Sequence, residues 1–167
     1  MPKNMKESKE KEVLIKQITN EEETIEVSEA FFAVADSGFG GKSPWSTESL
    51  YLSIGSENST VFYARIDGKV VGFIVASETQ FTLDIYIVVV DEGYKNRQIG
   101  RQLLQALIQY AKEKGIPEIL LETRKSNEPA LALYKRVGFE KVGLRKAYYS
   151  SPIEDAVVMK KEVREEN

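Results

Sequence analysis

A cluster of basic side chains stands where a buried strand of this chain gives way to a helix. The run from Asp84 to Asp91 is apolar and rich in β-branched residues, which is typical of a buried strand. Lys95, Arg97 and Arg101 follow in the connecting loop and the first turn of the helix. Backbone N–H groups at a helix start lack partners and carry the positive end of the helix dipole, so this turn suits a phosphate group. We expect an anionic, diphosphate-bearing cofactor here; the alternative is an ordinary solvated helix start, because surface helices carry Lys and Arg routinely.

The residue types that the chain lacks restrict its chemistry. Its 167 residues include no cysteine and no histidine. This excludes a thiolate nucleophile, a disulfide, an imidazole base and a Cys/His metal site. Acid–base chemistry must therefore come from Asp, Glu, Tyr, Lys, water or the substrate, and we expect no metal ion.

Two side chains are candidates for acid–base work. Glu122 ends an apolar strand, and Tyr134 lies in the helix that follows. In open sheets, ligands bind beyond the carboxyl ends of parallel strands, which places Val88–Val90 and Glu122 at the expected binding edge. Spacing alone fits other roles at least as well: a structural ion pair between Glu122 and Arg124, and a core aromatic ring for Tyr134.

The overall composition is that of one globular domain. The 167 residues are 42% hydrophobic and 29% charged, enough to bury a core. A net charge of −3 argues against a nucleic-acid-binding surface. No apolar run reaches the ~18 residues of a membrane span and the first residues are too polar for a signal peptide, so we expect a cytoplasmic protein. Residues 1–11 alternate Lys and Glu and predict a flexible charged tail, followed by a single domain at 12–167.

Hydrophobic periodicity and capping signals predict a mixed α/β (α+β) sheet with the element order β-α-α-β-β-β-α-β-α-β-β. Helices are expected to begin near Asn20, Ser46, Gln98 and Asn127. Strands are expected at residues 13–18, 61–66, 69–75, 81–90, 119–124, 139–144 and 155–163. A full helix separates the fourth and fifth strands, so these two can lie parallel in a right-handed βαβ unit.

Three local patterns refine this layout. The dipeptide Asp67-Gly68 predicts a two-residue hairpin turn. Residues 148–152 are expected to form the loop between the last two strands. The third predicted helix should bury one apolar face, made of Ile99, Leu103, Leu104, Leu107 and Ile108.

The loop before that helix resembles the phosphate motif of the GNAT N-acetyltransferase superfamily, commonly written R/Q-x-x-G-x-G/A. The matching residues here are Lys95-Asn96-Arg97-Gln98-Ile99-Gly100. The last glycine matches, the first basic position is conservatively changed, and Gln98 stands where the family has its middle glycine. A side chain there makes a positive φ more costly than it is for glycine.

The second half of the chain carries a more specific resemblance. The stretches 121–139, 144–149 and 154–159, together with Pro44-Trp45-Ser46, resemble the RimI-type ribosomal-protein-alanine N-acetyltransferases. The similarity extends over roughly residues 13–163. It implies the GNAT acyl-CoA N-acyltransferase fold and transfer of acetyl from acetyl-CoA to the α-amino group of a protein N-terminus, such as that of a ribosomal protein.

The resemblance also assigns roles to individual residues. Glu122 corresponds to the general base and Tyr134 to the general acid, while Trp45 and Tyr149 correspond to walls of the acceptor groove. Asn127, a good helix cap in any case, corresponds to a CoA contact. The remaining implied cofactor contacts are Val88, Val89 and Val90 for the pantetheine arm and Asn96, Arg97, Gln98, Ile99, Gly100 and Arg101 for the diphosphate.

Two other functions stay open at this point. The same fold and cofactor could serve a lysine side chain or a small-molecule amine, although an amine with a pKa near 10.4 demands stronger deprotonation than an α-amine. Alternatively, the altered loop at Gln98 could belong to a non-catalytic CoA-binding domain. The sequence predicts no oligomeric state.

Overall fold

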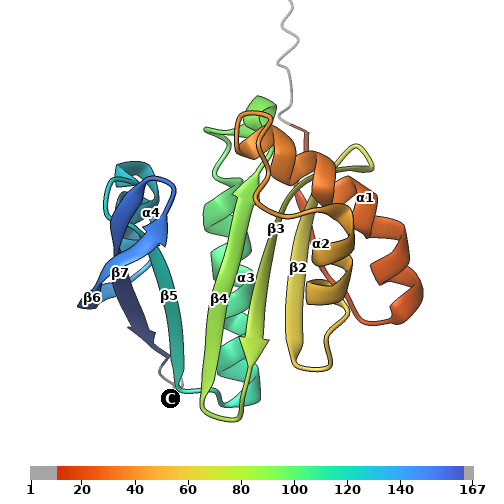
Figure 1. Cartoon of the computed structure of the whole chain (residues 1–167). Helices are drawn as coiled ribbons and strands as arrows, with labels where there is room; N and C mark the ends of the chain where they lie inside the picture. Colours follow the sequence, from red (N-terminus) through yellow and green to blue (C-terminus); the bar gives the residue numbers. More distant parts are fainter. Residues whose placement is uncertain (1–10, 164–167) are drawn as a thin grey trace, which may run out of the picture.

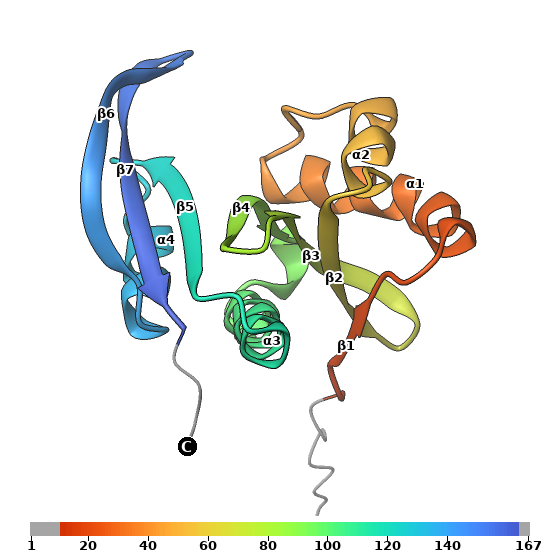
Figure 2. The same ribbon diagram turned by 90° about the horizontal axis from the view of Figure 1, so that it is seen from below.

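The computed structural model describes residues 11–163, which form one mixed seven-stranded sheet with the strand order β1-β2-β3-β4-β5-β7-β6. Figure 1 shows α1 and α2 in front of the sheet, and Figure 2 shows α3 on the opposite side. The elements are β1 (Leu14–Gln17), α1 (Glu21–Gly38), α2 (Thr47–Ile54), β2 (Ser59–Ile66), β3 (Lys69–Glu78), β4 (Thr82–Val90), η1 (Glu92–Tyr94), α3 (Ile99–Lys114), β5 (Glu118–Arg124), α4 (Glu128–Arg136), β6 (Glu140–Ser150) and β7 (Ile153–Glu162). The predicted element order is confirmed, with the short 3-10 helix η1 as an addition.

The charged tail expected at residues 1–11 lies outside the described residues, apart from Lys11. That side chain pairs with Asp67 in the β2–β3 turn, at 2.5 Å between Lys11 Nζ and Asp67 Oδ2. No helix within residues 11–163 combines the length and the apolar composition needed to cross a membrane.

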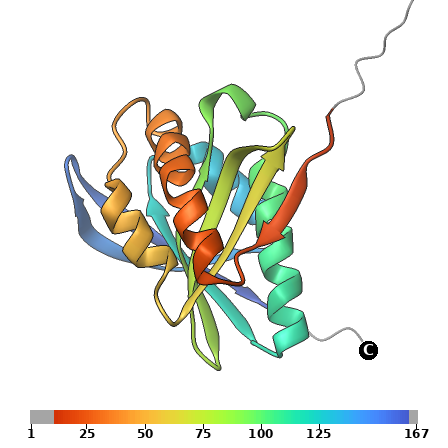
Figure 3. The ribbon, with the colours of Figure 1, turned by 90° about the vertical axis from the view of Figure 1, so that its right-hand side faces the viewer.

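Two apolar clusters cover the two faces of the sheet. On the side of α1 and α2, the ring of Phe31 stacks on that of Phe73 with their centroids 4.1 Å apart. On the other side, α3 and α4 share a cluster with β1 and the sheet, and β1 lies at the edge next to α3 (Figure 3). The predicted apolar face of α3 is buried as a whole: Ile99, Leu103, Leu104, Leu107 and Ile108.

Short-range sequence signals produce the local structure that they predict. Asn20 caps α1 by accepting a hydrogen bond from Glu23 N at 2.8 Å. Ser46 and Ser49 form a reciprocal capping box at the start of α2. Asp67 and Gly68 have φ values of 50° and 77°, as the tight hairpin turn between β2 and β3 requires.

The feature that positions the functional site is the separation of β4 from β5. These parallel strands pair only from Thr82 with Glu118 to Ile85 with Leu121, although β4 continues to Val90. The split begins at a β-bulge, because β3 pairs with Ile85 and then with Ile87 and so leaves Tyr86 as an extra residue. A bulge increases local twist and bends its strand. The last residues of β4 therefore run away from β5 and open a wedge in the middle of the sheet (Figure 1).

The prediction of a loop at residues 148–152 is wrong in its bounds. Tyr148 and Tyr149 belong to β6, which continues to Ser150. The ladder with β7 is interrupted between Arg145 and Tyr149, where Ala147 has a φ of 50° and donates its N–H to Asp155 Oδ1 at 2.9 Å. This irregularity breaks the alternation of side chains on which a strand prediction depends, so the sequence pattern ends before the strand does.

Gly38 gives a test of how tightly α1 is seated against β4. A Cβ atom at this position would lie 2.8 Å from Val90 O and collide with Val89 Cγ2. We expect Gly38→Ala to lower the free energy of unfolding by roughly 1–3 kcal/mol, because the rigid backbone of β4 must shift. Urea unfolding measures the change.

Gly143→Ala is the matched control for this substitution. No heavy atom lies within 4 Å of the Cβ that would be added at Gly143. Equal stability of the Gly38 and Gly143 variants would contradict the close packing of α1 on β4.

Candidate active site

A cavity of about 610 Å³ lies beside the end of β4. Its walls come from the end of α1, the last residues of β4, the loop before α3, the first turn of α3, and α4. Every residue predicted to contact the cofactor lines this cavity except Arg97: Val88, Val89, Val90, Asn96, Gln98, Ile99, Gly100, Arg101 and Asn127. The structure thus brings together two segments, β4 with its loop and α4, that the sequence analysis linked only through a resemblance.

The first turn of α3 opens onto this cavity without a side-chain cap. Gln98 is the N-cap residue, and its φ of 58° and ψ of 26° place it in the left-handed region. The first helical hydrogen bond to its carbonyl comes from Gln102 N at 3.0 Å. The N–H groups of Ile99, Gly100 and Arg101 precede that bond and have no helical acceptor. The positive φ considered at Gln98 from the sequence is therefore present, and the turn keeps the amide donors that an anion needs.

Two arginine side chains supply positive charge at the cavity. Arg101 Nη1 donates to Gln98 Oε1 at 3.3 Å, and Arg136 contributes to the wall from the last turn of α4. Within residues 11–163, neither guanidinium forms an ion pair with a carboxylate. Lys95 differs, because its Nζ is 2.7 Å from Glu92 Oε2 and also donates to Gly38 O at 3.3 Å. Arg101 and Arg136 are thus the cations left to meet an anionic ligand.

Arg97 points to a different part of the surface. Its Nη2 donates to Lys11 O at 3.2 Å, and it lines a neighbouring hollow that shares Asn96, Gln98 and Arg101 with the main cavity. The structure therefore does not bring Arg97 to the cavity that holds its neighbours Asn96 and Gln98. Its expected contact with the cofactor stays a prediction.

A second, smaller hollow, here called the Glu122 groove, lies next to the open wedge. It has a volume of about 430 Å³. Its polar lining consists of Asp84, Tyr86, Glu122, Arg145, Tyr148 and Tyr149. Glu122 directly follows Leu121, the last residue of β5 that pairs with β4. No group of three or more possible ligand side chains among residues 11–163 is arranged to hold a metal ion.

The Glu122 carboxylate is held by two neighbours from β6. Arg145 Nε lies 3.0 Å from Glu122 Oε1, and the Tyr148 hydroxyl forms a hydrogen bond with the same carboxylate, which raises the pKa of Tyr148. The Glu122 side chain is 24% exposed, so it remains open to the groove. The structural partner of Glu122 is therefore Arg145, and Arg124, the partner considered from the sequence, pairs with Glu154 instead.

Tyr134 is buried at the bottom of the main cavity. Burial, and secondarily the neighbouring Tyr149, raises the pKa of Tyr134 to about 12. Its ring packs edge-on against Phe139 with a centroid distance of 5.9 Å. Burial, and then the charge of Glu122, raises the pKa of Tyr149 in turn. Tyr149, which lines the Glu122 groove, thus interacts electrostatically with Tyr134 of the main cavity and with Glu122 of the groove.

Trp45 is not brought together with these residues. It lines neither the main cavity nor the Glu122 groove. Its half-buried ring contacts Phe39 edge-on at 5.5 Å between centroids and packs against the cluster on the α1 side. Phe39 itself lines the main cavity. A role for Trp45 in acceptor binding stays a prediction.

Sequence reasoning missed several groove residues. Asp84 and Tyr86 alternate along β4 with the buried Leu83, Ile85 and Ile87. The two-residue period of a strand could therefore have predicted that both side chains are exposed on the same face. Partial burial, and then the charge of Glu122, raises the pKa of Asp84. Nothing local indicated the pairing of β6 with Glu122, because that contact depends on the register of strands far apart in the sequence.

Comparison with known proteins identifies the family. Residues 20–139 match the Acetyltransferase (GNAT) family. N-alpha-acetyltransferase RimI of Mycobacterium tuberculosis is 35% identical over 128 residues, which are 74% of this chain and 79% of that protein. The [ribosomal protein bS18]-alanine N-acetyltransferase of Escherichia coli is 35% identical over 121 residues, which are 70% of this chain and 79% of that protein.

Two further comparisons concern structure and length. The crystal structure of the ribosomal-protein-S18-alanine N-acetyltransferase from Escherichia coli superposes with a TM-score of 0.81 at 25% identity, covering 93% of this chain and 97% of that one. An uncharacterized protein of Mycobacterium leprae is 33% identical over 130 residues, and this match covers 75% of the present chain but only 35% of that protein. The chain belongs to the GNAT acetyltransferase family, which confirms the resemblance found in the sequence, and it is an acetyl-CoA-dependent N-acetyltransferase.

The loop at Gln98 offers a direct test of the cofactor site. A left-handed backbone costs about 1–2 kcal/mol for a residue with a side chain and nothing comparable for glycine. We expect Gln98→Gly to leave the dissociation constant for CoA unchanged or to lower it, as measured by isothermal titration calorimetry. A tenfold loss of affinity would show that the Gln98 side chain itself makes a needed contact.

Arg101→Met serves as the comparison for that variant. It removes one of the two unpaired guanidinium groups at the cavity, so we expect a roughly tenfold weaker affinity for CoA, in line with the loss of one hydrogen bond to a charged group.

Proposed function

We propose that this protein is an Nα-acetyltransferase that moves acetyl from acetyl-CoA directly to the α-amino group of a protein N-terminus, such as that of a ribosomal protein. The observation that carries the proposal is a pair of hollows at the split between β4 and β5: a cavity with free amides and arginines beside Val88–Val90, and an open groove with the carboxylates of Asp84 and Glu122. Two of the similar proteins support this acceptor: the one from Mycobacterium tuberculosis is an N-alpha-acetyltransferase and the one from Escherichia coli is a [ribosomal protein bS18]-alanine N-acetyltransferase. A ribosomal acceptor places the enzyme in the cytoplasm, the compartment expected from the sequence.

The charge of the groove suits an acceptor that arrives as an ammonium ion. Asp84 and Glu122 face one guanidinium, that of Arg145. An α-amino group has a reference pKa of about 7.7–8.0, whereas that of a lysine side chain is about 10.4. Deprotonating a lysine would require roughly 3 kcal/mol more at the same pH. The candidate bases of the groove are carboxylates, Glu122 beside the wedge and Asp84 in the paired part of β4, so the α-amine, which loses its proton more easily, is the acceptor that the groove fits better.

Glu122 is the residue that we assign to remove the proton. It stands at the point where β5 leaves β4, one residue beyond the last pair of these strands, and it lines the groove together with Tyr86. Arg145 and Tyr148 fix its carboxylate, and Arg145 is 60% exposed, so an incoming ammonium or an ordered water can share the carboxylate with it. The neutral amine then attacks the thioester carbonyl, forming the C–N bond.

The open edge of β4 stabilises the negative charge that develops on the carbonyl oxygen. Residues 86–90 have no pairing with β5, so backbone N–H groups on that side are free to act as an oxyanion hole. The C–S bond then breaks and the thiolate leaves. Because the chain contains no cysteine, it has no thiol through which an acyl-enzyme could form, and transfer is direct.

We assign Tyr134 to stabilise the leaving sulfur. The resemblance implies that Tyr134 is a general acid, and its pKa refines that role. Full proton transfer from a phenol with a pKa of about 12 to a thiolate whose reference pKa is about 8.5 is uphill by roughly 5 kcal/mol. A hydrogen bond from the Tyr134 hydroxyl stabilises the thiolate without that transfer. The amine gives its proton to Glu122, which releases it to solvent. The departing thiolate takes up a proton from solvent, so that the overall charge balances.

The reaction itself is the first test. We expect the purified protein to release CoA from acetyl-CoA in the presence of a hexapeptide that begins with alanine, because the groove accepts an α-ammonium group. A thiol reagent measures the release cleanly, since the chain contributes no thiol of its own. Controls are the same peptide with a blocked N-terminus and a blocked peptide with one lysine. Faster turnover of the lysine peptide would contradict the proposed acceptor, and retained CoA binding without turnover of any amine would favour a non-catalytic domain.

The roles of the two candidate catalytic residues are tested separately. Glu122→Gln should lower kcat at least tenfold, because a positioned base typically contributes 10²–10⁴-fold to the rate. Tyr134→Phe should lower kcat roughly tenfold, because it removes one hydrogen bond to the charged thiolate. Affinity for CoA should stay within about twofold, since neither side chain supplies the cations of the cavity. Full activity in both variants would remove these assignments.

A further inference from the structure

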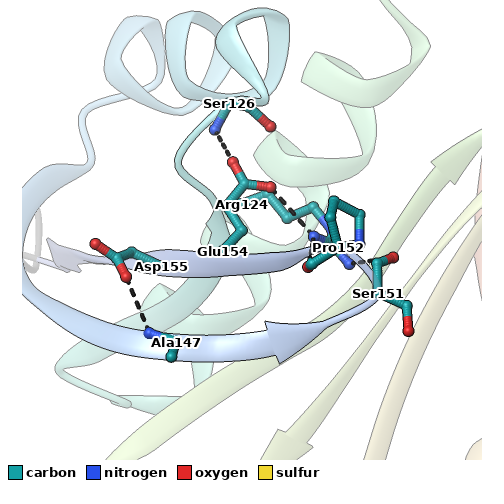
Figure 4. Close-up of polar contacts among 7 residues, drawn as sticks. All are labelled: Arg124, Ser126, Ala147, Ser151, Pro152, Glu154 and Asp155. Carbon is teal, nitrogen blue, oxygen red and sulfur yellow. Dashed lines mark hydrogen bonds and ion pairs between the residues drawn. The ribbon is translucent and has the colours of Figure 1, made fainter.

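Arg124, the last residue of β5, contacts the hairpin of β6 and β7 at several points (Figure 4). Its Nη1 donates to Pro152 O at 3.1 Å, and its Nη2 donates to Ser151 O at 3.4 Å. Nη1 also lies 3.1 Å from Glu154 Oε1. The same guanidinium stands over the ring of Tyr149, 4.4 Å from its centroid. One side chain thus binds the turn of the hairpin, an acidic residue of β7 and an aromatic residue of β6.

Glu154 extends this contact to the other binding site. Its second carboxylate oxygen accepts a hydrogen bond from Ser126 N at 2.6 Å (Figure 4). Ser126 precedes Asn127, which caps α4 and lines the main cavity. Both charged side chains are largely covered, at 33% exposed for Arg124 and 17% for Glu154. The pair therefore joins the end of β5, the β6–β7 hairpin and the loop that leads into α4.

The hairpin depends on this contact because its own ladder is incomplete. Pairing between β6 and β7 is interrupted between Arg145 and Tyr149, and both of these residues line the Glu122 groove. Two pairs, Tyr149 with Glu154 and Ser150 with Ile153, form the end of the hairpin beyond the interruption. Backbone pairing holds Tyr149 only through this short end of the ladder. The Tyr149 ring contacts Tyr148, at 5.1 Å between centroids, and Arg124, and of these two Arg124 also binds the turn.

We infer that Arg124 is a positioning residue for the acceptor: it holds Tyr149 and the β6–β7 turn in place as the wall of the Glu122 groove. This inference rests on the proposed function. An arginine suits the task because its planar group presents several N–H donors in fixed directions and stacks on aromatic rings, whereas a lysine is a point charge. The competing explanation is an ordinary ion pair with Glu154 that stabilises the fold alone, as many partly exposed pairs do to a small extent.

The experiment compares Arg124→Met, Arg124→Lys and the control Lys125→Met. Lys125 is an exposed cation beside Arg124 whose side chain lies outside both hollows. For each variant, kcat and the KM values for an alanine-starting hexapeptide and for acetyl-CoA are measured. Hydrogen–deuterium exchange of residues 145–154 is measured on the same full-length proteins.

Arg124→Met should raise the peptide KM about tenfold, as expected when the groove wall is in place in only about a tenth of the molecules, while the KM for acetyl-CoA stays within about twofold. Exchange of residues 145–154 should increase while that of α3 stays the same. Arg124→Lys should restore the fold but only part of the peptide KM, and Lys125→Met should behave as the unaltered protein.

An unchanged peptide KM, equal increases in both KM values, or full rescue by Arg124→Lys would overturn the positioning role. If Arg124→Met fails to fold, the peptide KM of Arg124→Lys and its hydrogen–deuterium exchange at residues 145–154 test the positioning role instead. Absence of any peptide acetylation by the unaltered protein would instead refute the proposed function, and hydrogen exchange would still report whether Arg124 holds the hairpin.

Discussion

The site depends on the early end of pairing between β4 and β5. Backbone N–H and C=O groups inside a sheet are normally satisfied by the neighbouring strand, yet β4 has no partner on its β5 side beyond Ile85. The bulge at Tyr86 turns the strand away from β5. Helices α3 and α4 pack closely beside the wedge, since a Cβ atom added to Gly100 of α3 would lie 3.2 Å from Leu133 Cδ2 of α4. The opening offers a ligand unpaired backbone groups in an otherwise dry core, and both hollows lie against it.

Electrostatics divides this opening into two halves. On one side, the uncapped turn of α3, Arg101 and Arg136 favour an anion. On the other side, Glu122 and Asp84 favour a cation. The buried Tyr134 lines the first half and Tyr149 lines the second. In the proposed reaction, an acetyl donor that is anionic at one end and an acceptor that arrives protonated approach the same point from sides that suit their charges. A chain with a net charge of only −3 then needs no general excess of either sign.

The sequence predicted what a few consecutive residues determine. The cap at Asn20, the turn at Asp67-Gly68 and the apolar face of α3 each depend on local geometry, and each is present. The loop predicted to bind the cofactor, at 95–101, could be proposed for the same reason, since its charges and the helix start lie within seven residues of one another, and most of it lines the main cavity. What escaped prediction depends on register: the bulge at Tyr86, the broken ladder before Tyr149, and the pairing of Glu122 with Arg145 in place of Arg124. Strands far apart in the chain must first align before these contacts exist, and no short window of sequence contains that information.

A crystal structure of the protein with CoA and an alanine-starting peptide tests the central claim most directly. The account predicts the diphosphate on the N–H groups of Ile99 to Arg101, the pantetheine arm along Val88–Val90, and the sulfur between Tyr134 and the peptide amine beside Glu122. Cofactor bound elsewhere, or a Tyr134 hydroxyl and a Glu122 carboxylate directed away from the sulfur and the amine, would contradict it.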